Sequence, residues 1–301
     1  MDKKDLHPLK IWYLAIRPKT LPAATGPVII GIGLALADGV FKLGPALAAL
    51  LTALLLQIGS NLANDVYDYR KGADTQERTG PLRVTQAGLL SPRQVMVGMC
   101  LVFALAALIG LYLIMIGGWP ILIIGIAAII SAIAYTAGPF PLGYKGVADL
   151  FVFAFFGPVA VCGTYYLQAG HLSEITWWAS LQPGLLVTAI LVVNNLRDIE
   201  TDRKAGKKTL AVRFGVKFTQ AEYISLVALA YLLPLLMWLK GIAPFTVLLT
   251  WLSLPLIIPN VKDVLSKKGS PLNATLAGTA KSGLFFSILF AIGYLLGRLM
   301  P

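Results

Sequence analysis

The feature that most constrains this chain is a succession of long apolar runs. An α-helix needs roughly 20 mostly apolar residues to cross the hydrocarbon core of a bilayer. Nine runs of about this length can be placed, at 20–38, 44–63, 95–115, 119–136, 147–167, 177–196, 221–239, 242–260 and 281–299. Because they take up nearly all of the 301 residues, the sequence predicts an all-α polytopic membrane protein with a single domain, 1–301.

The composition supports a membrane protein and argues against a nucleic-acid-binding one. Hydrophobic residues make up 57% of the chain and charged residues only 13%, with a mean hydropathy of +0.77. The formal net charge of +11 could indicate nucleic acid, but the basic residues fall in short segments between apolar runs, without an aromatic-rich basic stripe. We therefore predict that the basic residues lie at the surface of a lipid bilayer and that the protein does not bind nucleic acid.

The basic residues also predict an orientation. With the N-terminus in the cytoplasm, the cytoplasmic segments are 1–19, 64–94, 137–146, 197–220 and 261–280. These segments hold 21 of the 25 Lys and Arg residues, as the positive-inside rule requires. We expect a multi-pass protein of a bacterial cytoplasmic (inner) membrane. Residues 9–16 are predicted to form a short interfacial helix, because Trp12 and Tyr13 suit the headgroup level.

Acidic residues are rare and form two clusters. Seven of the 14 follow the second and sixth apolar runs: Asp65, Asp68, Asp74, Glu77, Asp198, Glu200 and Asp202. Both clusters leave the membrane on the same side of the predicted topology, so the fold can bring them together. The expected site is therefore cytoplasmic and is carried by two loops, 64–94 and 197–220.

The two clusters share a pattern in which an Asn precedes an Asp by four residues. The copies span 64–68 and 194–198, and the second continues to Asp202. On a helix of 3.6 residues per turn, positions four apart lie on one face, so these side chains can point at one ligand. In the first copy Asp74 would return to the same place from the loop.

Carboxylates and bases alternate in these segments, which predicts a diphosphate site. Mg²⁺ takes oxygen ligands and commonly shares a substrate phosphate, and interspersed cations suit the phosphate itself. The candidate cations are Lys71, Arg78, Lys145, Arg197 and Lys207. A single base at the end of a span is more often a solvated flank. Carboxylates beside apolar helices, by contrast, are costly unless they have partners.

These motifs resemble the UbiA superfamily of intramembrane prenyltransferases, and within it the branch that acts on 1,4-dihydroxy-2-naphthoate in menaquinone synthesis. The resemblance runs nearly end to end. It is carried by RPKTLP at 17–22, NDVYDYRKGAD at 64–74, YTAGPFPLGYKG at 135–146 and NNLRDIETDRKAGKKTLAVRFG at 194–215. It implies nine helices around a central cavity, with cytoplasmic caps over its mouth.

The resemblance also implies a reaction and a metal site. A polyprenyl group would pass from its diphosphate to the naphthoate, with loss of CO₂ and diphosphate. Two Mg²⁺ ions would be held, one by Asp65, Asp68 and Asp74, the other by Asp198 and Asp202. The superfamily's first motif has a third Asp where this chain has Gly72, so Asp74 stands in for it.

The remaining expected site residues support these groups. Asn64 and Asn194 would join the diphosphate site at the starts of the two motifs, and Lys145 would act beside Asp65, Asp68, Asp198 and Asp202 in catalysis. Aromatic faces can stabilise a carbocation. The expected aromatic and prenyl pocket is Tyr67, Tyr135, Phe151 and Asn195.

Two alternatives stay open on the sequence alone. Another member of the superfamily, acting on 4-hydroxybenzoate or homogentisate, would share the Asp clusters. A membrane transporter would also have many spans, but its ionisable residues are expected near the middle of the bilayer. Here they lie at the ends of the spans. Nothing in the apolar pattern defines the length of the prenyl chain.

Overall fold

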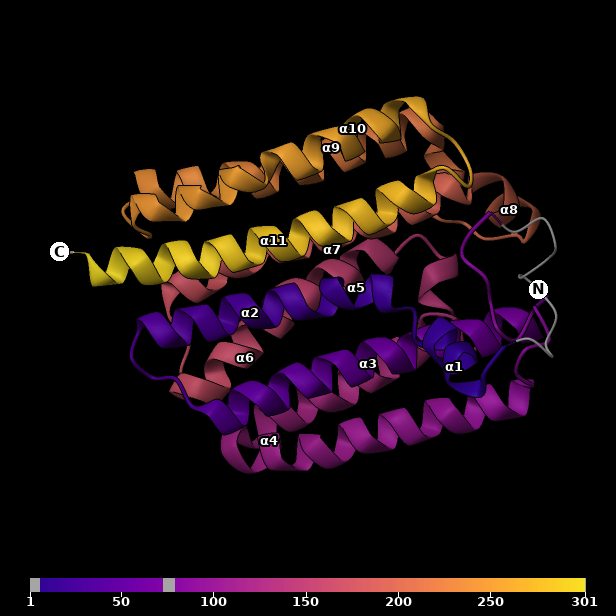
Figure 1. The fold of residues 1–301 in the computed structure, drawn as a ribbon, viewed down its shortest axis with the longest axis horizontal. Coiled ribbons are helices and arrows are strands. Elements are labelled where there is room, and N and C mark those ends of the chain that lie inside the picture. The colour runs from indigo at the N-terminus through magenta and orange to yellow at the C-terminus, as the bar shows by residue number, and fades with distance from the viewer. Residues whose placement is uncertain (1–5, 73–78, 301) are drawn as a thin grey trace.

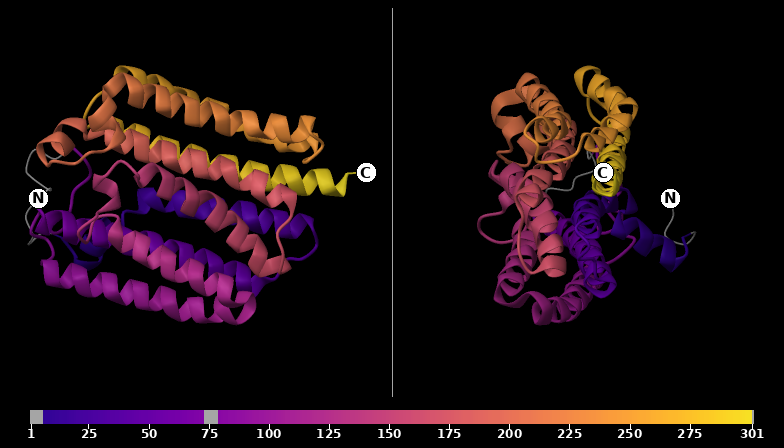
Figure 2. Two further views of the ribbon diagram at one scale, coloured as in Figure 1. Left: turned by 180° about the vertical axis from the view of Figure 1, so that it is seen from behind. Right: turned by 90° about the vertical axis from the view of Figure 1, so that its left-hand side faces the viewer.

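Long helices lying side by side make up the protein (Figure 1). The computed structural model describes residues 6–72 and 79–300, and within these ranges every regular element is helical. Eight helical segments in this part of the chain are long and apolar enough to cross a membrane. Figures 1 and 2 show them running roughly along the long axis of the molecule. The predicted all-α, multi-pass membrane architecture is confirmed.

Three of the eight segments are built from shorter pieces. The α-helices are α1 (Pro8–Ile16), α2 (Leu21–Ala37), α3 (Leu43–Arg70), α4 (Pro92–Ala134), α5 (Ala148–Ala154), α6 (Ala160–Ala169), α7 (Glu174–Arg197), α8 (Ile199–Lys204), α9 (Leu210–Leu239), α10 (Leu254–Ser266) and α11 (Leu272–Leu299). The 3₁₀ segments are η2 (Pro18–Thr20), η3 (Leu142–Tyr144) and η5 (Phe245–Ser253). A π-helical segment, η4 (Phe155–Val159), joins α5 to α6 around Pro158, which has no backbone N–H to continue the α pattern.

The helix α4 contains two of the predicted spans. Gly118 breaks it with φ 67° and ψ −154°, a backbone conformation open mainly to glycine. A straight helix of 43 residues would be about 65 Å long, yet Val95 from one arm packs in the same apolar cluster as Ile133 from the other. The chain therefore doubles back at Gly118.

Several helices continue beyond the apolar runs into the segments predicted as loops. α3 extends through the first acidic cluster to Arg70, and α9 begins at Leu210 and bends at Gly215, where φ is 82°. Polar residues do not end a helix that has left the lipid, because its backbone hydrogen bonds are satisfied internally. The helix predicted at 9–16 is present as α1.

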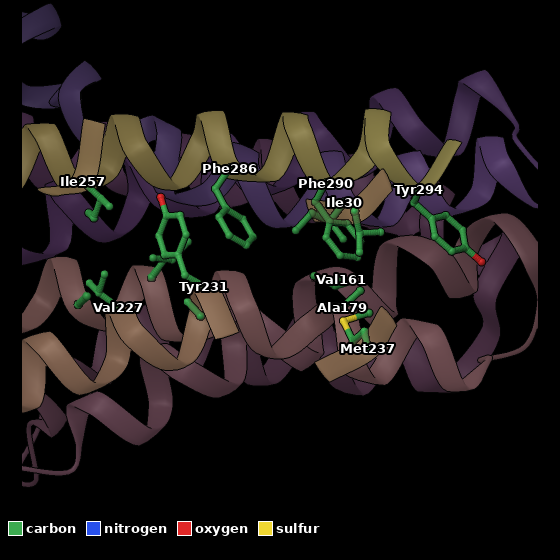
Figure 3. Close-up of a cluster of buried hydrophobic side chains, with 14 of the residues drawn as sticks. Ile30, Val161, Ala179, Val227, Tyr231, Met237, Ile257, Phe286, Phe290 and Tyr294 are labelled. Atoms are coloured by element: carbon green, nitrogen blue, oxygen red, sulfur yellow. The ribbon is translucent and has the colours of Figure 1, made fainter. Parts of the chain in front are cut away.

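The main apolar core packs α11 against α7 and α9. Figure 3 shows Phe286 of α11 beside Tyr231 of α9, with Phe290 one helical turn further along α11. The rings of Tyr231 and Phe286 meet edge to face with centroids 5.1 Å apart, and the Tyr231 hydroxyl is 2.6 Å from Ser253 Oγ. A second cluster joins α1, α3 and α4. The two clusters hold the long helices of the bundle together.

Candidate active site

The two acidic clusters meet at one end of the bundle, and Tyr144 lies between them. Its hydroxyl donates to Asp68 at 2.9 Å. Its ring centroid is 5.0 Å from Lys71 Nζ and 4.9 Å from Lys207 Nζ. Lys207 in turn pairs with Asp202 at 3.0 Å. A continuous set of contacts thus connects the motif on α3 with the motif after α7.

The pKa of the Tyr135 hydroxyl is also affected by carboxylates from both motifs. Burial raises the pKa of Tyr135, and the carboxylates of Asp149, Asp202 and Asp68 raise it further. Burial also raises the pKa of Asp202, while the Lys207 ammonium acts in the opposite direction. Carboxylates from both motifs therefore act on one tyrosine.

Asp65, at the start of the first motif, is buried beneath the loop that follows. Its two carboxylate oxygens accept hydrogen bonds from the backbone amides of Val84 and Thr85, each at 3.1 Å. Arg17 lies 3.8 Å away and holds a left-handed backbone conformation with φ 56°, which is uncommon for a residue other than glycine. A carboxylate oxygen has more than one acceptor position, so Asp65 as a metal ligand stays a prediction.

The rest of the first motif is held in place by neighbouring segments. Asp68 is 4% exposed and accepts from Arg83 at 2.9 Å as well as from Tyr144. Asn64 accepts from the Thr136 hydroxyl at 3.1 Å, and Lys71 donates to the Thr136 carbonyl at 2.6 Å. The segment just after α4 therefore orients two residues expected to bind the diphosphate.

In the second motif, Arg197 is the central side chain. Its guanidinium donates to Asp198 and Asn273 at 2.8 Å, and to Asn194 at 2.7 Å. Thr79, from the loop after the first motif, donates to Asp198 at 2.7 Å and accepts from Asn273 at 2.9 Å through its carbonyl. The predicted loop 64–94 thus contacts the second motif directly through Thr79.

The segment that carries Lys145 is fixed against the start of α9. The backbone N–H of Lys208 donates to the Tyr144 carbonyl at 2.8 Å, and Arg213 donates to the Lys145 carbonyl at 3.2 Å. The Lys145 ammonium itself lies 4.9 Å from the centroid of the Phe140 ring. The backbone thus holds Lys145 beside the Tyr144 junction.

An apolar cavity of about 400 Å³ extends from this end into the bundle, between α2, α3, α4 and the α5–α6 segment. Tyr135, Leu142 and Phe151 line it. Of the other expected pocket residues, Tyr67 packs in the cluster of α1, α3 and α4, and Asn195 is buried on α7; neither is among the residues that line the cavity. Tyr135 is therefore shared by the charged site and the apolar space.

The carboxylates of the two motifs suit a hard cation, although those that the structure describes form no complete cage. Asp68, Asp198 and Asp202 supply carboxylate oxygens of the kind Mg²⁺ prefers. Within residues 6–72 and 79–300, no three His, Cys, Asp or Glu side chains gather closely enough to hold an ion by themselves. Mg²⁺ usually completes its shell with water and substrate phosphate. Asp74 and Arg78, two further predicted site residues, lie outside the described residues.

Sequence reasoning missed five residues of this network: Arg17, Thr79, Thr136, Tyr144 and Asn273. Tyr144 could have been noticed because it directly precedes Lys145 in the 135–146 motif, and Asn273 because it falls in the predicted cytoplasmic segment 261–280. Thr79 carries no signal of its own in the sequence.

These features define a multi-pass integral membrane protein with a charged site at one end of an apolar cavity. Residues 24–289 match the UbiA prenyltransferase family. The chain belongs to this family and is a prenyltransferase. The resemblance carried by the sequence motifs is thereby confirmed, and the transporter alternative is set aside.

Characterised relatives cover the chain from end to end. A 1,4-dihydroxy-2-naphthoate octaprenyltransferase from Haemophilus influenzae is 40% identical over 299 residues, 96% of this chain and 97% of the relative. The enzyme of the same name from Escherichia coli is 36% identical over 305 residues, 99% of each chain. A UbiA homolog from Archaeoglobus fulgidus, bound to DMAPP and Mg²⁺, shares the fold with a TM-score of 0.63 at 16% identity, over 92% of this chain and 98% of that one.

Proposed function

We propose that the protein transfers a polyprenyl group from polyprenyl diphosphate to 1,4-dihydroxy-2-naphthoate, releasing CO₂ and diphosphate and giving a demethylmenaquinol. The observation that carries the reaction class is the meeting of two Asp motifs around Tyr144, at the end of an apolar cavity. The acceptor is inferred from the two naphthoate octaprenyltransferases that match almost the whole chain.

We propose nine membrane crossings, because each arm of α4 on either side of Gly118 is close to the length of a span. The N-terminus and the active site would then face the cytoplasm from the inner membrane, as the basic segments require. α1, α8 and the segments around them would cap the cavity on that side.

Two Mg²⁺ ions would be held by oxygens of the two motifs, Asp65, Asp68 and Asp74 on one side and Asp198 and Asp202 on the other. Bound Mg²⁺ would neutralise charge on the departing diphosphate. The A. fulgidus homolog, whose structure contains Mg²⁺ together with DMAPP, supports this use of a divalent ion. Several of these carboxylates pair with Arg or Lys side chains. A metal ion that bound the carboxylates would displace these basic side chains, which could then bind the diphosphate.

The basic residues would bind the diphosphate itself. Lys71 and Lys207 place two ammonium groups about one tyrosine ring, and Lys207 pairs with Asp202. A diphosphate bound here would be attracted by both ammonium groups. Lys145 and Arg78 would add charge at the same place, while Arg197 with Asn194, and Asn64 with Thr136, hold the motifs in position. The resulting shell stabilises the leaving group electrostatically.

The apolar cavity would hold the isoprenoid chain and keep water from the reacting carbon. Breaking the allylic C–O bond leaves a carbocation, which any water within reach would capture. Tyr135 and Phe151 present aromatic rings at the end of the cavity that faces the site and could stabilise this cation. The electron-rich ring of the acceptor then forms the new C–C bond.

An assay of acceptors tests the proposal. Purified protein would be incubated with Mg²⁺, one prenyl diphosphate, and either 1,4-dihydroxy-2-naphthoate, 4-hydroxybenzoate or homogentisate. We expect a prenylated product and stoichiometric CO₂ from the naphthoate. Prenylation of 4-hydroxybenzoate or homogentisate in its place would assign the protein to another branch of the family.

A further inference from the structure

The helical glycines fall into two groups. Most allow close approach of another element: a Cβ at Gly33, for example, would clash with the Cβ of Ala291. Gly110, Gly125 and Gly163 differ, because a Cβ added to any of them would meet no atom within 4 Å apart from its chain neighbours and the nearby backbone of its own helix. Helix packing does not require glycine at these three positions.

Backbone conformation does not require it either, since none of the three has a positive φ. Glycine inside a helix is less favourable than alanine because it has more conformational freedom to lose. All three line the apolar cavity. What glycine does provide at these positions is free volume in the cavity, because it has no side chain.

The three glycines lie at one level of the bundle. Gly110 comes eight residues before the reversal at Gly118 and Gly125 seven after it, while Gly163 comes seven before Gly170, the C-cap of α6. At 1.5 Å per residue, each is about 10–12 Å from the end of the bundle opposite the Asp motifs.

The surroundings of the cavity differ on the two sides of this level. Between the three glycines and the end of the bundle opposite the Asp motifs, the side chains of Leu113, Ile121 and Leu167 are buried against one another. They close the far end of the cavity. Near this level, Leu111, Leu122 and Ile126 of α4 line the cavity and are 59%, 43% and 52% exposed. Side chains that line the cavity and remain this exposed are not covered by another helix, so the cavity is open to the side at this level, where a bilayer would supply lipid.

We propose that Gly110, Gly125 and Gly163 determine which prenyl chain lengths the enzyme accepts. This rests on the proposed function, in which the cavity holds the isoprenoid chain. A short chain ends above the glycines. A long chain extends past the glycines and cannot continue through the closed far end. It therefore bends towards the lipid, and the absence of side chains at the three glycines gives it room to do so.

Adding side chains at this level tests the inference. Gly125→Leu and Gly163→Leu would be compared with Gly125→Ala and with Ala104→Leu, which adds similar bulk on the exposed surface of α4 away from the cavity. Transfer from octaprenyl diphosphate and from geranyl diphosphate would be measured with one acceptor. A methylene group in an apolar pocket already changes discrimination about tenfold or more.

We expect the ratio of octaprenyl to geranyl transfer to fall about tenfold or more in the Leu variants, less in Gly125→Ala, and not at all in Ala104→Leu. Gly125→Ala should melt no lower than wild type, because no packing contact is lost. Equal losses with both substrates in a folded Leu variant would overturn the inference. Failure of the wild type to transfer either chain would instead refute the proposed function.

Discussion

The hydroxyl of Tyr144 provides a sharp test of the site. Tyr144→Phe removes the hydrogen bond to Asp68, 2.9 Å long, and keeps the ring between the two lysines. A hydrogen bond to a charged group contributes about 1.5–3 kcal/mol. If that contribution orients Asp68 for the metal and the diphosphate, kcat/KM falls roughly 10- to 150-fold. Asp68 keeps its contact with Arg83, so the variant should still fold.

The chain offers a matched control at the opposite end of the bundle. The Tyr165 hydroxyl donates to Asp38 at 2.7 Å, and Arg298 lies 3.7 Å from the same carboxylate. Tyr165→Phe therefore removes the same kind of bond far from the proposed site. Initial rates would be measured over a range of Mg²⁺ and prenyl diphosphate concentrations, with melting temperatures in parallel. Wild-type activity in Tyr144→Phe, or an equal loss of activity in Tyr165→Phe, would refute a role for the Tyr144 hydroxyl in the site.

Three further predictions concern the metal site and the fold. Asp68→Asn and Asp198→Asn should abolish turnover and leave a membrane-inserted protein that elutes as wild type in size-exclusion chromatography; normal rates in both would remove them from the site. Chelation of Mg²⁺ should stop transfer and re-addition restore it, whereas transfer in the chelator would contradict the metal role. Ser91→Ala removes the capping box with Gln94 at the start of α4 and should cost about 1 kcal/mol of stability without lowering kcat, as thermal unfolding and kinetics would show.

Much of the fold could be predicted because lipid imposes a simple rule on sequence. Apolar runs of bilayer length must be helical, and the break near Gly118 was visible as a gap between two runs. The ends of the helices were less predictable. α3 continues to Arg70 through residues that carry the first motif, because polar side chains are tolerated once a helix leaves the lipid.

The site was predictable in its residue types and less so in its contacts. The repeated Asn and Asp spacing pointed to both motifs. The structure connects them through Tyr144, and Thr79 of the loop 64–94 contacts Asp198 of the second motif. Neither link could be derived from spacing, since both depend on distances between segments far apart in the chain. Asp65 shows the same limit: the sequence suggested a metal ligand, and the structure adds two backbone amides bound to its oxygens.

The most direct test of the account counts the metal ions. Mn²⁺ would replace Mg²⁺, and electron paramagnetic resonance would measure bound Mn²⁺ with and without a prenyl diphosphate, in wild type, Asp68→Asn and Asp202→Asn. We expect two bound, magnetically coupled ions in the wild type with the diphosphate, and loss of the coupling in each variant. Wild-type protein that binds the diphosphate without Mn²⁺, or variants with unchanged coupling, would contradict a shared site built by the two motifs.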